Sequence, residues 1–181
     1  MKKLSAAAFA FGLLSVSVSQ ALAADATVNF SGTILQEACS VDTSDNTVNV
    51  QLGTYGAAQF PTVGTTTLPV PFAINLTGCP ASGGPTAALV TFSGAADAAG
   101  DLALTAGGAS GVSINIKKAD GTNIDINSTD SGIALTSATT QQLRFTANYI
   151  STAASVTAGA ANAVAQVNIS VSYTHLRAHE T

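Results

Sequence analysis

The chain is divided into short segments in which apolar and polar residues alternate, with turn-forming residues between them. A period of two is typical of strands that bury one face. Many short, closely spaced strands favour a β-sandwich or barrel over a helical or α/β fold. We expect strands at Thr47 to Leu52, Val70 to Leu76, Ala87 to Ser93, Leu102 to Leu104, Val112 to Lys117, Asn123 to Ile126, Leu143 to Ile150 and Val164 to Val171.

The composition agrees with an all-β fold. Only 9% of the residues are charged, Trp is absent, and Ala, Thr, Ser, Val and Asn are abundant. β-branched residues suit pleated sheets, whereas Ser, Thr and Asn compete with helical hydrogen bonding. Between two of the expected strands, Asp120-Gly121 predicts a hairpin turn between Ile116 and Ile124.

The chain begins with a pattern typical of a secretory signal peptide. Lys2 and Lys3 precede an apolar run from Leu4 to about Val18, and Ala21-Leu22-Ala23 forms a small-x-small cleavage site. We therefore expect the exported protein to begin at Ala24. From there to position 172, three basic residues stand against nine acidic ones, a net charge of −6. Nucleic acid is a poor partner for such a protein.

The first segment of the exported chain, Ala24 to Leu35, also alternates. Its small or apolar positions are Ala26, Val28, Phe30, Gly32 and Ile34. This pattern predicts a strand with one buried face. Because the strand lies at the end of the chain, it can pair within its own molecule or with another.

Two cysteines, Cys39 and Cys79, occur in an exported chain, where thiols oxidise. A single disulfide is the default interpretation, with free thiols or a metal site as the alternatives. In the chain-entropy model, closing a loop of about 40 residues stabilises the fold by about 4 kcal/mol.

The sequence contains little that points to catalysis. Both histidines lie in the last eleven residues, Val171 to Thr181, so the usual general base is missing from the remainder. A glycosidase would need a convergent pair of acids. The candidates sit in predicted turns, where Asp commonly binds its own backbone: Asp97, Asp101, Asp120, Asp125 and Asp130.

Two further motifs are weak. The stretch from Asp120 to Asp125 has some likeness to a calcium loop but lacks the glutamate and the spacing of a complete one. Lys117-Lys118 is most simply a solvated strand end. We expect no enzyme activity, no metal and no cofactor.

Several blocks, in their order and spacing, resemble type 1 fimbrial pilins of the chaperone–usher pathway. They are ATVNFSGTILQEACSVD (26–42), TVNVQLGTY (47–55), PFAINLTGC (71–79), LRFTANY (143–149) and GAANAVAQVNIS (159–170). The resemblance implies an incomplete immunoglobulin-like β-sandwich that lacks its final strand. In this family, the N-terminal extension of the next subunit fills the resulting groove, after a periplasmic chaperone has occupied it.

By position, the resemblance implies a role for several residues of this chain. Ala26, Val28, Phe30, Gly32 and Ile34 would form the donor face, and Cys39 and Cys79 the family's disulfide. The last strand of the acceptor groove would involve Gly159, Val167 and Ile169. The implied divisions are a signal peptide (1–23), a donor-strand extension (24–35), a pilin domain (36–172) and a foreign tail (173–181).

The expected tail rests on the run VSYTHLRAHET, which resembles the translation of an adapter used to prepare sequencing libraries. A genuine polar tail is the alternative. The family has a glycine fourteen residues from its end and an aromatic residue next to last. Counting from Gly159 places that aromatic at Val171, and we regard the nearby Tyr173 as coincidental.

The implied function is a structural subunit of a surface fimbria that supports cell adhesion. Its partners would be neighbouring pilin subunits, a periplasmic chaperone and an outer-membrane usher. The alternative is a fimbrial tip adhesin or another secreted carbohydrate-binding β-sandwich, for which Tyr55, Phe60 and Tyr149 are the candidate aromatic residues. Each is better placed as a core or strand residue, and the chain shows no additional lectin domain.

Overall fold

The computed structural model describes residues 39–42, 47–130 and 132–173. All of them belong to one of the two units into which the chain divides, residues 35–181. The predicted signal peptide and the donor residues Ala26, Val28, Phe30, Gly32 and Ile34 lie outside the described residues. Within the described part, no helix has the length and apolar character needed to cross a membrane.

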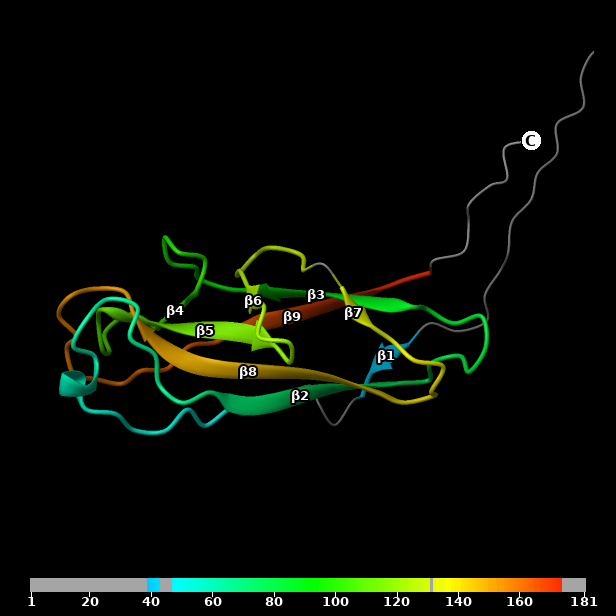
Figure 1. The fold of residues 1–181 in the computed structure, drawn as a ribbon, viewed down its shortest axis with the longest axis horizontal. Coiled ribbons are helices and arrows are strands. Elements are labelled where there is room, and N and C mark those ends of the chain that lie inside the picture. Colours follow the sequence, from blue (N-terminus) through cyan, green and yellow to red (C-terminus); the bar gives the residue numbers. More distant parts are fainter. Residues whose placement is uncertain (1–38, 43–46, 131, 174–181) are drawn as a thin grey trace, which may run out of the picture. The chain divides into compact units, whose positions relative to one another are not determined.

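The described residues form two antiparallel sheets and one 3₁₀ turn, Ala57–Gln59 (Figure 1). The larger sheet has the order β1-β2-β8-β5-β4, with β6 also on β5, and the smaller has the order β7-β3-β9. The strands are β1 (Ser40–Val41), β2 (Val70–Thr77), β3 (Ala87–Ser93), β4 (Leu102–Ala103), β5 (Val112–Lys118), β6 (Asn123–Ile124), β7 (Ile133–Ala134), β8 (Gln141–Ser151) and β9 (Gln166–Ser172).

Alternation in the sequence corresponds to alternation in burial. In β3, Ala88, Val90 and Phe92 are buried, while the residues between them are half-buried. Three aromatic rings then join the two sheets. Phe145 of β8 stacks on Phe72 of β2 with 5.4 Å between ring centroids, and meets Phe92 of β3 edge to face at 5.3 Å. The expected all-β sandwich is confirmed.

The hairpin predicted at Asp120-Gly121 is also confirmed. Ile116 of β5 pairs with Ile124 of β6. Gly121 has a φ of +85°, a conformation that costs glycine little. The Asp120 carboxylate accepts a hydrogen bond from the Thr122 N–H at 2.9 Å, which closes the turn.

One predicted strand is wrong. Residues 47–52 form no strand and pair with no strand of the described part of the chain. Their alternation is nevertheless real, since Leu52 is buried and Val50 packs against the core. The alternation shows that one face of this segment packs on the core. It does not show whether another strand lies beside the segment. The short strands β1 and β7 were not expected, because two residues give no periodic signal.

Candidate functional site

A cavity of about 650 Å³ opens between two segments of the sandwich. Residues 47–52 form one wall, and residues 163–169, which include the start of β9, form the other. Its floor is the apolar core itself, contributed by both sheets: Phe72, Ile74, Phe92, Leu102, Ile114, Ile116 and Ala147. We call this cavity the groove.

The rim of the groove also carries exposed apolar residues. Six large hydrophobic residues are exposed in the described part of the chain, and four of them line the groove: Val41, Val48, Val164 and Val167. Val164 is 75% exposed. Clustered apolar residues of this kind mark a surface that a partner covers.

The backbone along the groove is also unpaired. β9 forms a ladder with β3 through seven residue pairs, from Ala87–Ser172 to Ser93–Gln166, and with no other described strand. The facing segment 47–52 has no ladder partner among the described residues. A strand edge with free N–H and C=O groups is a template for pairing with another chain. The groove therefore offers an incoming strand both a backbone ladder and an apolar floor.

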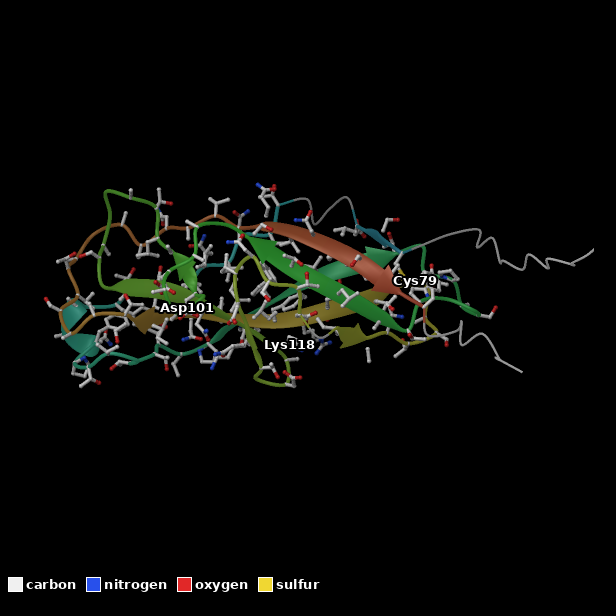
Figure 2. All side chains as sticks on the ribbon, turned by 90° about the horizontal axis from the view of Figure 1, so that it is seen from above. Cys79, Asp101 and Lys118 are labelled. Atoms are coloured by element: carbon white, nitrogen blue, oxygen red, sulfur yellow. A yellow bond between two sulfur atoms is a disulfide. The ribbon has the colours of Figure 1, made fainter. Side chains whose placement is uncertain are left out.

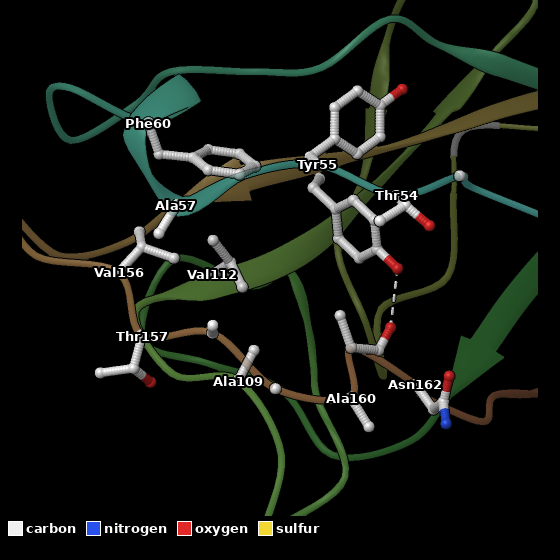
Figure 3. Close-up of a pocket in the computed structure, with 15 residues that line it drawn as sticks. Thr54, Tyr55, Ala57, Phe60, Ala109, Val112, Val156, Thr157, Ala160 and Asn162 are labelled. Atoms are coloured by element: carbon white, nitrogen blue, oxygen red, sulfur yellow. Dashed lines mark hydrogen bonds between the residues drawn. The ribbon is translucent and has the colours of Figure 1, made fainter.

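A second cavity, of about 430 Å³, is enclosed by the next residues of the same two segments. Residues 53–60 lie along one side and residues 156–162 along the other (Figure 3). We call it the aromatic cavity, because Tyr55, Phe60 and Tyr149 line it. The groove and the aromatic cavity thus follow one another along the same pair of segments.

Tyr149 ties the core of the sandwich to one side of the aromatic cavity. Its ring meets that of Tyr55 edge to face, with centroids 6.1 Å apart. Its hydroxyl donates a hydrogen bond to the carbonyl oxygen of Ala161 at 2.8 Å, the dashed line in Figure 3. Burial raises the pKa of the Tyr149 hydroxyl, so it remains a donor at neutral pH. The ring is therefore engaged in packing and in holding the backbone at Ala161.

The three residues expected on the last strand of the acceptor groove do not lie together. Val167 and Ile169 are in β9 and line the groove. Gly159 precedes β9 and lines the aromatic cavity. The opposite wall, residues 47–52, was not singled out as part of a site. Its alternation at Val48, Val50 and Leu52 was the available signal.

A disulfide joins Cys39 and Cys79, with their Cα atoms 4.3 Å apart. Cys79 is buried in the core cluster. The bond lies next to the pairing of β1 with the end of β2, where Ser40 faces Thr77. It therefore fixes Cys39 and the start of β1 to the end of β2.

Four of the five acids considered for catalysis, Asp97, Asp101, Asp120 and Asp130, have carboxylates that accept hydrogen bonds from the protein's own backbone or side chains. Oδ1 of Asp97 accepts hydrogen bonds from the N–H groups of Ala99 and Asp101 at 2.8 and 3.0 Å. Oδ1 of Asp101 accepts one from Nδ2 of Asn115 at 2.6 Å. Asp130 likewise accepts one from the Gly132 N–H at 2.8 Å. These carboxylates hold loops in place, as turn-forming aspartates do.

The expectation that Lys117-Lys118 is a solvated strand end is wrong for Lys118. Only 8% of Lys118 is exposed, and its Nζ lies 3.5 Å from Oδ2 of Asp130. The reason is tertiary: the loop that carries Asp130 brings a carboxylate to the end of β5. Figure 2 labels Lys118, Asp101 and Cys79 at three different places along the sandwich. Within the described ranges, no three His, Cys, Asp or Glu side chains are grouped as metal ligands.

Comparison with known proteins agrees with this geometry. A family model described as "Fimbrial protein" matches residues 28–172. The probable major fimbrial subunit LpfA of Escherichia coli O157:H7 is 37% identical over 177 residues, covering 96% of this chain and 97% of that protein. Fimbrial subunit type 1 of Salmonella typhimurium is 38% identical over 148 residues, covering 76% of this chain and 77% of its own. The crystal structure of the P pilus rod subunit PapA has a similar fold, with a TM-score of 0.64 and 21% identity over 75% of this chain and 99% of that one.

Proposed function

Because the chain belongs to the fimbrial protein family and is a structural subunit of a chaperone–usher fimbria rather than an enzyme, we propose that its copies polymerise by donor-strand exchange. Residues 24–35 of one subunit would lie in the groove of a neighbouring subunit. The donor face would be Ala26, Val28, Phe30, Gly32 and Ile34. The neighbour is another pilin, either a second copy of this chain or a related subunit.

The observation that carries this proposal is the groove, a cavity with an apolar floor between β9, which has one edge free of any described strand, and residues 47–52, which pair with no described strand. Strand addition to such an edge gives main-chain hydrogen bonds for affinity and pockets for alternate side chains for specificity. Burial of Val28, Phe30 and Ile34 would contribute roughly 1.5–3 kcal/mol each. Gly32 contributes no such burial, and its role would be to allow close approach of the two backbones.

The exposed groove also explains why partners are needed before assembly. An open apolar cavity beside free strand edges promotes aggregation. A periplasmic chaperone that covers the groove would prevent this, and an outer-membrane usher would then exchange the chaperone for the next subunit's extension. The predicted signal peptide at residues 1–23 would supply the export step, and the finished fimbrium lies at the cell surface.

A tip adhesin has less support. The relatives described above are fimbrial subunits and match 96% and 76% of this chain. The aromatic residues that a carbohydrate site would use are occupied in packing: Phe60 and Tyr149 are buried, and Tyr55 packs on Tyr149. We therefore keep the structural subunit as the proposed role.

The test is a pair of substitutions on opposite faces of the donor segment. We expect Phe30→Asp to prevent a subunit from joining a neighbour, because a carboxylate would be buried against the groove floor. The matched control, Ser31→Asp, adds the same charge to the other face and should still assemble. Fibre length by electron microscopy and SDS-resistant oligomers on gels are the measurements.

A deletion of the donor segment provides a second test. Deletion of Ala24 to Gly32 should leave a subunit that folds and accepts a strand but cannot donate one. Mixed with unaltered protein, it should shorten the fibres by occupying one end. Normal polymerisation of the deletion variant alone would contradict donor-strand exchange.

A further inference from the structure

The wall of the aromatic cavity is hydrogen-bonded to a second segment of the chain. Residues 157–162, which form this wall, run beside residues 105–111, and we call the two segments together the clasp. The Thr105 N–H donates a hydrogen bond to the Asn162 carbonyl at 2.7 Å, and the Ala109 N–H donates to the Ala160 carbonyl at 2.9 Å. The Thr157 N–H donates in turn to the Ser110 carbonyl at 3.1 Å. The wall is therefore fixed along its length although it belongs to no strand.

A hydroxyl pair closes the far end of the clasp. Oγ of Ser110 lies 2.7 Å from Oγ1 of Thr157, and the Ser110 N–H also donates to Oγ1 of Thr157 at 3.0 Å. The Ser110 side chain is not part of the cavity lining. The Ser110 side chain can therefore affect the cavity only by changing the position of the wall.

Two glycines allow the segments of the clasp to approach so closely. A Cβ on Gly108 would overlap the carbonyl oxygen of Ala160. A Cβ on Gly159 would lie 2.5 Å from the Ala109 nitrogen and 2.7 Å from the Gly108 carbonyl carbon. The obstacles are backbone atoms, so no side chain can move aside. Space rather than backbone conformation requires glycine at these two positions.

The opposite side of the same wall faces the aromatic residues. The Tyr149 hydroxyl binds the Ala161 carbonyl, so the wall is held between Tyr149 in front and residues 105–111 behind. The N–H groups of residues 158–165 donate to no other described residue. A displacement of the wall toward Tyr55 and Tyr149 would thus narrow the aromatic cavity and shift this row of free donors.

We propose that the clasp sets the width of the aromatic cavity so that it admits one side chain of the incoming strand. Gly108 is then a positioning residue for strand binding: it does not line the aromatic cavity and acts through the position of the wall. Gly159 permits the same close approach but is itself part of the cavity lining. This inference rests on the proposed function, since it concerns the same incoming segment. It adds a site for one side chain beyond the groove, and a mechanism that keeps that site open.

The test measures binding of a labelled synthetic peptide of residues 24–35 to the protein exported to and purified from the periplasm, at a concentration at which it stays monomeric. Two variants disturb the clasp: Gly108→Ala, by steric overlap with Ala160, and Ser110→Ala, by loss of the hydroxyl pair. Each has a matched control. The control for Gly108→Ala is Gly84→Ala, whose added Cβ would also meet a backbone oxygen, that of Pro80 at 2.6 Å, at a residue that lines neither cavity. The control for Ser110→Ala is Ser155→Ala, at an exposed residue outside both cavity linings.

The decisive readout is a double-mutant cycle with alanine at peptide positions Val28, Phe30 and Ile34. In the unaltered protein, alanine at the position that fills the aromatic cavity should weaken binding by about tenfold or more. In the Gly108→Ala protein the same peptide change should cost less than about threefold, because the side chain no longer enters. The other peptide positions should cost the same in both proteins. Ser110→Ala should show a smaller coupling energy with alanine at the same peptide position. The two control variants should show no coupling with any peptide position.

The outcomes separate the two proposals. If the peptide does not bind the unaltered protein, the proposed function fails and this inference fails with it. If it binds but both clasp variants weaken all peptides equally, or leave all unchanged, the clasp does not position the cavity and only this inference is overturned. If Gly108→Ala fails to fold, as judged by urea unfolding, the Ser110→Ala cycle decides alone.

Discussion

At the scale of single residues, Asp101 is a buried acid whose surroundings disfavour the ionised form of its carboxyl group. Burial raises the pKa of its carboxyl group, and the negative charges of Asp97 and Asp125 raise it further. The hydrogen bond from Asn115 and the charge of Lys117 act in the opposite direction without cancelling the effect. The ionised form is therefore less favourable in the folded protein than in the unfolded chain.

The sign of the pH dependence follows from this. Because the folded-state pKa of Asp101 lies above the unfolded value of about 3.9, stability rises as the pH falls through the folded pKa, and the gain is complete below the unfolded value. We expect Asp101→Asn to raise the free energy of unfolding at pH 7, since an amide oxygen can still accept the Asn115 hydrogen bond. The variant should also show a shallower rise in stability between pH 7 and pH 4 in urea unfolding.

Asp120 provides the contrast. Hydrogen bonds from Thr122 lower the pKa of its carboxyl group. Its contribution to stability is therefore present above the unfolded pKa and is lost as the pH falls through the folded one. Asp120→Asn should lower stability at pH 7. A change of the same sign in both variants at pH 7 would contradict this account of Asp101.

At the scale of elements, the groove lies between β9, which pairs with β3 on one side only, and residues 47–52, which pair with no strand of the described part of the chain. Its floor is the rigid part, since Phe72 and Phe92 belong to the ring cluster around Phe145. Its rims are exposed and contribute little to the stability of the isolated subunit. Substitutions on the rim should therefore affect assembly and folding to different extents.

Val164 and Val63 allow this difference to be measured. Both are exposed, at 75% and 60%, but only Val164 lines the groove. Each change to Asp should alter the free energy of unfolding by about 0.5 kcal/mol or less, as is usual for surface positions. Val164→Asp should nevertheless reduce binding of the peptide of residues 24–35, and Val63→Asp should not. Equal peptide affinities for the two variants would show that the rim is not covered by the incoming strand.

At the scale of the whole molecule, β9 has a described strand on one side only, and the disulfide adds to the stability that the core of the sandwich supplies. Cross-linking Cys39 to Cys79 restricts the unfolded chain across a separation of 40 residues. On the chain-entropy model this is worth about 4 kcal/mol, a large share of the 5–15 kcal/mol that stabilises a typical domain.

We therefore expect Cys39→Ser to reduce the amount of folded subunit recovered from the periplasm by severalfold. The double variant Cys39→Ser/Cys79→Ser removes the leftover thiol and controls for incorrect pairing with other proteins. Recovery of both variants at the level of the unaltered protein would show that the disulfide is dispensable for folding.

The sequence by itself determined the strands and turns that local chemistry controls. β3, with its alternating apolar residues, matches the expected bounds Ala87 to Ser93, and Asp120-Gly121 specifies its turn because few other residues adopt that backbone. The same reasoning gave the wrong state for residues 47–52. A period of two records which face meets the core, but not whether another strand lies alongside.

Only the tertiary structure decided what surrounds each element. It placed Asp130 beside Lys118. Lys118 is therefore buried, although its neighbours in sequence predicted only a solvated strand end. It also placed Gly159 against Gly108. Gly159 was expected on the last strand of the acceptor groove, but it lies before β9 and allows two segments to approach closely. The physical reason is the same in both cases. Close approach between segments far apart in the chain depends on packing, whereas periodicity and turn chemistry depend only on neighbours in sequence.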